Sequence, residues 1–205
     1  MLIKWLVATV PAPQRRAFSS SQQAWAPLSH CEGFLGQVGG WDQDGRGCII
    51  GLWRDTATYD RFMALAHDAI LAQSSGPPPF SKLDIELSHS IVRYAGTAAH
   101  LAAALERARW LRVQDCTVHA DHTMDFVAGA LQTRPARLAA SSAFCAGSTS
   151  VGDGRRFFET TLWDTADVPA GPLPTVRSSK TPDAPLTRLT AHRVALEPSW
   201  TLLPT

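Results

Sequence analysis

The second half of the 205-residue chain repeats the residue pattern of the first half at an offset of about 110 residues. An internal repeat of this kind usually means that one supersecondary unit is used more than once. The matching positions keep their order along the chain, which favours a duplicated unit over a chance likeness. They are 8–10 and 116–118, Phe18 and Phe126, 33–36 and 143–146, 52–57 and 162–166, and 87–91 and 190–194.

The first half is predicted to have the element order βαββαβ. Alternating apolar residues and turn residues predict strands, and apolar residues at helical spacing predict helices. The expected elements are strand 2–10, helix 14–28, strands 33–41 and 47–54 around a turn at 42–45, a helix that begins at Asp55 or Thr56, and strand 82–92. This order is that of a ferredoxin-like, split βαβ unit.

The second half is predicted to follow the same order with one element degraded. We expect strand 110–119, helix 121–132, and strands 139–148 and 155–163. The proline-rich stretch 165–185 cannot sustain a helix interior, so a short turn and coil are expected there. The predicted class is α+β with tandem ferredoxin-like repeats: residues 1–94 form the first repeat, 95–109 a linker helix, and 110–198 a second, degenerate repeat.

Composition excludes several classes of partner. Apolar residues make up 45% of the chain and charged residues 18%, which is enough for a sizeable core. The formal net charge of +1 lacks the basic excess of a nucleic-acid binder. No apolar run reaches the roughly 18–20 residues of a membrane span. These features predict a cytoplasmic protein whose partner is a small molecule. The four cysteines show no CxxC spacing, so neither a zinc site nor a disulfide framework is expected.

Several motifs together resemble those of a known family. They are Lys4-Trp5, Gln23-Ala24-Trp25, the stretch 33–41, and the series Trp53, Tyr59, Phe62-Met63 and His67-Asp68. Over residues 1–92 the chain resembles a group of uncharacterised small bacterial proteins in the dimeric α+β barrel superfamily, which includes the antibiotic-biosynthesis-monooxygenase-like proteins. Over 110–196 the resemblance rests on the internal repeat alone. It implies that antiparallel sheets of two units form a fused dimeric α+β barrel, present as a monomer or as a homodimer of fused barrels.

The resemblance also bears on cofactors. Cofactor-free, quinone-forming members of the superfamily use a strand Asn, a Trp four residues later and a Tyr six residues after that. This chain has Trp53 and Tyr59 at the second and third positions and Ile49 at the first. Haem-degrading members carry a His ten residues after the Trp, where this chain has Met63. The resemblance therefore implies no haem, and no cofactor is expected.

Three residues are the candidate catalytic group. His67 is expected to move a proton, because imidazole titrates near neutral pH, and Trp53 and Tyr59 are expected to position the substrate. Further residues are expected to bind substrate: His89, Trp5, Trp25, Phe62 and Met63. The alternatives are a surface role for His67, a core or edge role for His89, and simple packing for the tryptophans.

A metal site is not predicted. His119-Ala120-Asp121-His122 places possible ligands close together, but Asp121 also suits a helix N-cap and no distant further ligand stands out in the sequence.

Two functions remain open from the sequence. One is a small-molecule, cofactor-free monooxygenase-like enzyme, or a related lyase or isomerase, acting on an aromatic or polyketide-like substrate. The other is a non-catalytic ligand-binding or stress-associated α+β barrel, which is favoured by Ile49, by Met63 and by the degraded second repeat.

Overall fold

The computed structural model describes residues 1–73, 77–166, 168 and 186–205. Most of the coil expected at 165–185 lies outside these residues. The chain divides into two compact units, Met1–Leu87 with Val194–Thr205, and Ser88–Arg193. Strands β4 (Lys82–Ala95) and β8 (Leu186–Leu196) each contribute residues to both units. None of the helices in the described ranges is both long enough and apolar enough to span a membrane.

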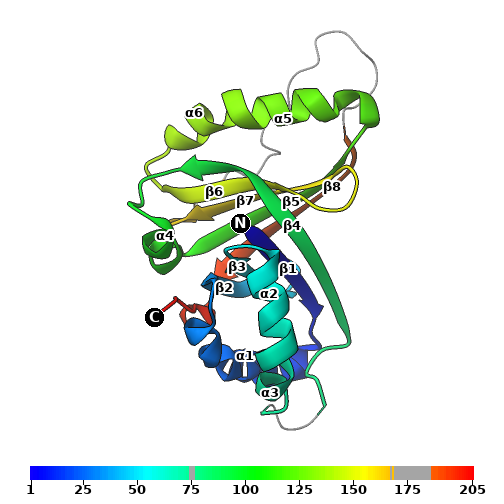
Figure 1. Cartoon of the computed structure of the whole chain (residues 1–205), viewed down its shortest axis with the longest axis vertical. Coiled ribbons are helices and arrows are strands. Elements are labelled where there is room, and N and C mark those ends of the chain that lie inside the picture. The colour runs from blue at the N-terminus through cyan, green and yellow to red at the C-terminus, as the bar shows by residue number, and fades with distance from the viewer. Residues whose placement is uncertain (74–76, 167, 169–185) are drawn as a thin grey trace. The chain divides into compact units, whose positions relative to one another are not determined.

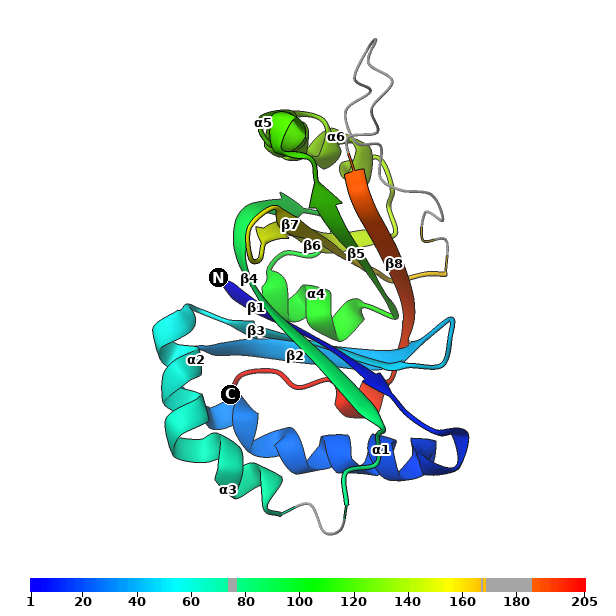
Figure 2. The same ribbon diagram turned by 90° about the vertical axis from the view of Figure 1, so that its right-hand side faces the viewer.

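The first unit is an antiparallel sheet with its helices on one face (Figures 1 and 2). Its elements are β1 (Leu2–Thr9), η1 (Ala12–Gln14), α1 (Arg15–Gln22), η2 (Gln23–His30), β2 (Phe34–Asp42), β3 (Gly47–Trp53), α2 (Thr56–Phe62), η3 (Met63–His67), α3 (Asp68–Leu71) and η5 (Pro198–Trp200). Strand β3 lies between β1 and β2, and the end of β8 pairs with β2 through Gly40 and Leu196. All expected strands are present. The expected helix 14–28 changes from α to 3-10 geometry after Gln22, and Pro27 lies in the 3-10 part.

The helix after β3 has two local features that matter for the site. Asp55 caps it, because the side-chain carboxylate accepts a hydrogen bond from the Thr58 amide at 2.8 Å. One π-helical turn, η3, then separates α2 from α3. A π turn shifts the side chains that follow it around the helix axis, so His67 is not placed as a regular α-helix would place it.

Strand register assigns the residues of β1 to the two faces of the sheet. Leu2 lies opposite Trp53, and both belong to the core that packs against the helices. Because side chains alternate along a strand, Lys4 shares the helix-facing side with Leu2, whereas Trp5 points to the other face.

The second unit has the same kind of architecture. It contains α4 (Leu101–Arg107), β5 (Trp110–Val118), η4 (Ala120–His122), α5 (Thr123–Gln132), α6 (Arg134–Ala139), β6 (Phe144–Val151) and β7 (Arg156–Trp163), together with parts of β4 and β8. Its strands pair antiparallel in the order β5-β7-β6-β4, and α5 and α6 lie along one face of the sheet (Figure 1).

One expectation for this half needs correction. The segment 134–139 forms α6, so the strand predicted from residue 139 begins only at Phe144. Pro135 stands in the first turn of α6, where proline is tolerated because its missing N–H would have no partner in the helix.

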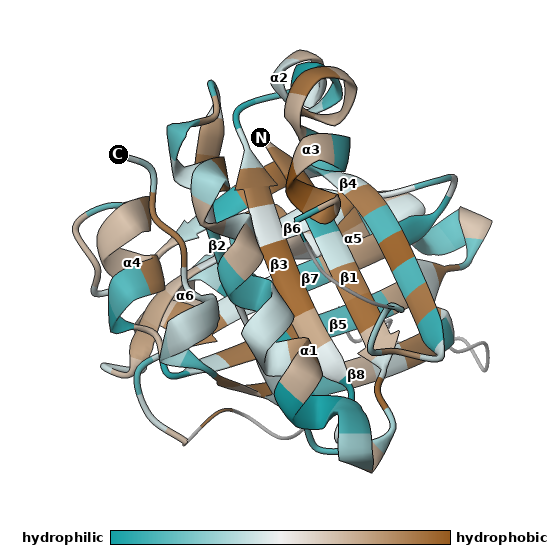
Figure 3. Ribbon diagram, turned by 90° about the horizontal axis from the view of Figure 1, so that it is seen from below, coloured by the Kyte–Doolittle hydropathy of each residue, from teal (hydrophilic) through white to brown (hydrophobic). Residues whose placement is uncertain are grey.

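The hydrogen-bonded strand order is β1-β3-β2-β8-β5-β7-β6-β4, and β4 and β8 contribute residues to both units. The expected α+β class with antiparallel sheets is confirmed. Strand β4 shows alternating polar and apolar residues along its length (Figure 3).

The two units build the same hairpin in detail. Leu2 pairs with Trp53 in the first unit, and Trp110 pairs with Trp163 in the second. A β-bulge interrupts the register after Phe34 in β2 and after Phe144 in β6. In each unit the Phe and Trp rings lie 5.3 Å apart between centroids.

Gly33, just before β2, allows a close approach between the hairpin and α2. Its φ of +77° lies in the left-handed region, and an added Cβ would stand 2.6 Å from the side chain of Thr58. We expect Gly33→Ala to lower the free energy of unfolding by about 1 kcal/mol from backbone strain and by about 1–3 kcal/mol more from the steric clash. Urea titration would measure this loss.

Gly154 provides the matched control for Gly33. Its φ is +63°, but an added Cβ would meet nothing within 4 Å. Gly154→Ala should therefore show only the backbone cost, and equal losses in the two variants would contradict the proposed contact with Thr58.

Candidate functional site

An aromatic cluster fills the space between the sheet and the helices of the first unit. Its buried members are Leu2, Leu28, Phe34, Trp53, Tyr59, Phe62 and Ile70, and partly buried Trp25, Cys31, Met63, Ala66 and Leu202 pack against them. The structure thus brings together five residues singled out from the sequence, which are Trp53, Tyr59, Phe62, Met63 and Trp25.

Trp53 lies at the centre of this aromatic cluster. Its ring stacks on Phe62 with 4.9 Å between centroids and an interplanar angle of 27°. Tyr59 meets the same indole edge-on at 5.6 Å. The helical spacing of Tyr59 and Phe62 puts both rings on the face of α2 that covers β3. Burial raises the pKa of the Tyr59 hydroxyl, so this phenol stays neutral at physiological pH.

His67 lies at the edge of the aromatic cluster. Its ring centroid is 5.6 Å from that of Trp25 and 5.8 Å from that of Phe62, and its side chain is 19% exposed. Nδ1 lies 2.8 Å from a carboxylate oxygen of Asp68, which favours a proton on Nδ1. Nε2 is then available to accept a proton, as a general base requires.

Lys4 is a site residue that the sequence reasoning did not single out as functional. Its ammonium lies 5.9 Å from the centroid of the Tyr59 ring, and burial lowers the pKa of this amine below its usual value. Among the residues that the structure describes, no carboxylate pairs with Lys4. Lys4 is half-buried, so its ammonium loses part of its hydration and has no counter-charge among these residues to compensate for the loss. The sequence feature that could have pointed to Lys4 is that it is the single charged residue in the otherwise apolar segment Leu2–Val7.

Two predicted substrate-binding residues lie apart from the aromatic cluster. Trp5 is buried on the opposite face of the first sheet. His89 is an exposed residue of β4 that pairs with Val151 and belongs to the second unit. Their part in substrate binding stays a prediction.

Ile49 occupies the position at which the quinone-forming relatives would have asparagine. It is 7% exposed and packs with Ala8, Phe18 and Trp200 in a separate apolar cluster. The side chain therefore offers no hydrogen bond at this point of β3.

The motif at 119–122 is a local surface arrangement. His119 Nδ1 lies 3.5 Å from an Asp121 carboxylate oxygen, and both side chains are more than half exposed. The rings of His119 and His122 are 6.1 Å apart.

The second unit has buried charged residues on its sheet and on α6. Arg134 of α6 places Nε 3.0 Å from a carboxylate oxygen of Glu159 on β7, and both side chains are almost fully buried. Arg112 of β5 is also buried. Burial raises the pKa of Glu159, an effect that Arg134 and Arg112 oppose. By strand register Glu159 corresponds to Ile49, and Arg112 to Lys4.

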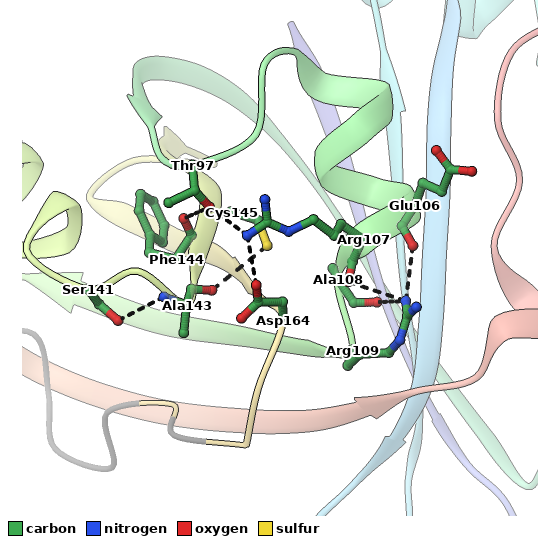
Figure 4. A network of polar contacts seen from close by, with 10 residues as sticks. All are labelled: Thr97, Glu106, Arg107, Ala108, Arg109, Ser141, Ala143, Phe144, Cys145 and Asp164. Carbon is green, nitrogen blue, oxygen red and sulfur yellow. Dashed lines mark hydrogen bonds and ion pairs between the residues drawn. The ribbon is translucent and has the colours of Figure 1, made fainter.

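A second polar network joins α4 to the ends of β6 and β7 (Figure 4). Arg107 donates hydrogen bonds of 2.7 Å to both Thr97 Oγ1 and an Asp164 carboxylate oxygen. Cys145 lies beside Arg107, and burial raises the pKa of its thiol. The thiol is therefore protonated at neutral pH, and this network serves to hold α4 in place.

Removing one partner of the Arg134–Glu159 pair should be strongly destabilising. We expect Arg134→Met to lower the free energy of unfolding by about 3–5 kcal/mol, because Glu159 is then buried beside one fewer positive charge. The double variant Arg134→Met/Glu159→Leu should lose less than the sum of the single losses. Arg61→Met, which breaks the exposed contact with Glu32, is the control and should cost less than about 1 kcal/mol. Additive single losses would contradict a direct interaction.

Lys4→Met should have the opposite effect on stability. At pH 7 it removes a half-buried ammonium that has no carboxylate partner among the described residues, so we expect a gain of about 0.5–1 kcal/mol. Because the pKa of Lys4 is lower in the folded state than in the unfolded state, the wild type gains stability as pH rises between those two values. The advantage of the variant should therefore be smaller at pH 10 than at pH 7, as thermal melts at the two pH values would measure. A loss of stability at pH 7 would contradict this account.

The N-terminal part of the chain matches a family of proteins of unknown function. Residues 2–88 match the family model described as domain of unknown function DUF4937. The uncharacterized protein YdbC of Bacillus subtilis is 38% identical over 78 residues, which are 36% of this chain and 66% of that protein. The match thus spans slightly less than two thirds of the length of that relative.

Solved structures with similar folds cover nearly the whole chain. A candidate monooxygenase from Lactobacillus acidophilus superposes with a TM-score of 0.70 at 12% identity, covering 98% of this chain and 95% of that one. For a candidate monooxygenase from Fusobacterium nucleatum the TM-score is 0.68 at 9% identity, with coverage of 95% and 91%. An anthrone oxidase-like protein gives 0.62 at 11% identity, with coverage of 96% and 91%. These identities establish the fold alone. Residues 2–88 thus match an uncharacterised bacterial family, and the chain has the fold of the monooxygenase-like α+β proteins that it resembles.

Proposed function

We propose that this protein is a monooxygenase-like enzyme that acts without a cofactor on a small aromatic or polyketide-like molecule. The observation that carries the proposal is the gathering of Trp53, Tyr59 and His67 in the aromatic cluster of the first unit. The proposed substrate is a planar ring system, because flat aromatic side chains pack best against flat ligands.

Each residue of the proposed site has a distinct task. His67 accepts a proton from the substrate through Nε2, since its Nδ1 is engaged by Asp68. Trp53 and Tyr59 position the substrate ring, and Trp25, Phe62 and Met63 complete the surface around it. Proton removal makes the substrate electron-rich enough to react with O2 directly. When a ring CH2 group becomes a carbonyl, one oxygen atom enters the substrate and the other leaves as water, so the substrate itself supplies the electrons.

The second unit has a supporting role in this proposal. We propose that residues 110–198 are a degenerate copy of residues 1–94, with 95–109 as the linker. The shared hairpin register and bulge support a common origin of the two units. The second unit has the buried Arg134–Glu159 pair, with Glu159 at the position of Ile49, so one chain would carry one working site. The enzyme would act in the cytoplasm, as a single fused chain or a homodimer of such chains.

A non-catalytic ligand-binding protein is the second candidate. Ile49 favours it, because this position lacks the amide of the quinone-forming relatives and is packed in an apolar cluster. Such a protein would bind the same aromatic molecules and leave them unchanged.

Oxygen uptake tests the proposed activity. Purified protein incubated with a panel of phenols and anthrones should consume O2, and product should be seen by mass spectrometry. His67→Ala should lower the rate by about 10²–10⁴-fold, the usual contribution of a general base. His119→Ala is the control, because this histidine is exposed and belongs to the second unit. Ligand binding with no O2 uptake from any member of the panel would favour the binding protein.

A further inference from the structure

Lys4 and Trp53 flank a glycine at the centre of the first sheet. Gly51 of β3 is the pairing partner of Lys4 in the register of β1 and β3. A Cβ added at Gly51 would have only two neighbours within 4 Å, Trp53 Nε1 at 3.9 Å and Lys4 Cβ at 4.0 Å. The sheet surface between Lys4 and Trp53 therefore has room for at least one more atom, although Gly51 itself is buried.

In the second unit a threonine occupies the position that corresponds to Gly51. Thr161 corresponds to Gly51, and its Oγ1 accepts a hydrogen bond of 2.9 Å from Trp163 Nε1. In the first unit, glycine removes this acceptor. Within the described part of the chain, the Trp53 indole N–H has no hydrogen-bond acceptor.

Two donors of the first sheet have no acceptor among the described residues; the Trp53 N–H borders the space at Gly51, and the Lys4 side chain borders it through its Cβ. One is the Lys4 ammonium, which contacts only the face of the Tyr59 ring among the described residues. The other is the Trp53 N–H. Lys4 is only half-buried and the Trp53 N–H is not fully enclosed by protein, so both donors are open to an acceptor supplied from outside. A positive charge beside a neutral N–H suits an oxyanion.

We propose that the first unit binds an aromatic oxyanion, a planar ring that bears a phenolate or a carboxylate, with its oxygen held by Lys4 and the Trp53 N–H beside Gly51. The rings of Tyr59, Trp25 and Phe62 contact the body of the ligand. This inference names the substrate class of the site in the proposed function, on which it rests, and it stands as a binding site even if no oxygenation occurs.

Paired ligands test the anion requirement. The probes are 2-naphthoate and its neutral relative 2-naphthalenemethanol, measured by isothermal titration calorimetry at pH 7 without turnover. We expect the wild type to bind 2-naphthoate at least about tenfold more tightly, the smallest preference expected if one charge-assisted hydrogen bond is worth about 1.5–3 kcal/mol. Lys4→Met should reduce the preference to near unity, and Lys4→Arg should retain most of it.

Gly51→Thr introduces the residue that the second unit has at this position. The threonine would fill the space and offer its hydroxyl to Trp53, so binding of both probes should fall at least tenfold while the thermal melt stays cooperative. Lys82→Met is the control, because Lys82 is exposed and pairs with Asp84. Its affinities should be those of the wild type.

The outcomes separate this inference from the proposed activity. Equal affinities of the two probes in the wild type, no measurable binding of either probe, a preference for 2-naphthoate that survives Lys4→Met, or affinities that survive Gly51→Thr would each overturn it. Selective 2-naphthoate binding without O2 uptake from any phenol would uphold the site and reject the monooxygenase.

Discussion

The contact between Phe34 and Trp53 organises the first unit. Both residues lie at one end of the β2–β3 hairpin, where a bulge at 34–36 directs their rings into the core. Tyr59 and Phe62 also pack against this indole. They reach it because α2 begins after the Asp55 cap, only three residues after Trp53. The position of α2, and through it that of His67, follows from the packing around Trp53. The same contact recurs between Phe144 and Trp163.

One backbone pattern thus supports two different interiors. Lys4, Ile49 and Gly51 line the helix-facing side of the first sheet, and Arg112, Glu159 and Thr161 occupy the corresponding positions of the second. In the second unit Glu159 pairs with Arg134 of α6, and the hydroxyl of Thr161 accepts a hydrogen bond from Trp163. In the first unit the Trp53 N–H and the Lys4 Cβ border the open position at Gly51. The polar groups of the second interior are used for stability, whereas those of the first remain available to a ligand.

Much of the fold could be predicted because it depends on local signals. Alternation and turn residues placed the strands of the first half, and the Asp55 cap and the spacing of Tyr59 and Phe62 placed α2 and its buried face. The start of β6 and the existence of α6 could not be predicted from the same signals, because Arg134 and Pro135 suit a loop as well as a first helical turn.

In the site, Trp53, Tyr59 and His67 could be grouped from their spacing. The grouping of Trp5 with them was based on residue type, which does not report the face of the sheet.

The sequence by itself determined the element order of the first half, the α+β class and the aromatic face of α2, since periodicity, caps and turns act over a few residues. Only the tertiary structure decided which charged and polar groups are paired. Lys4 and Gly51 are 47 positions apart in the printed sequence and become neighbours through strand register. The hydrogen-bond and ion-pair partners of Lys4 and of the Trp53 N–H depend on which side chains β1, β3 and α2 bring together.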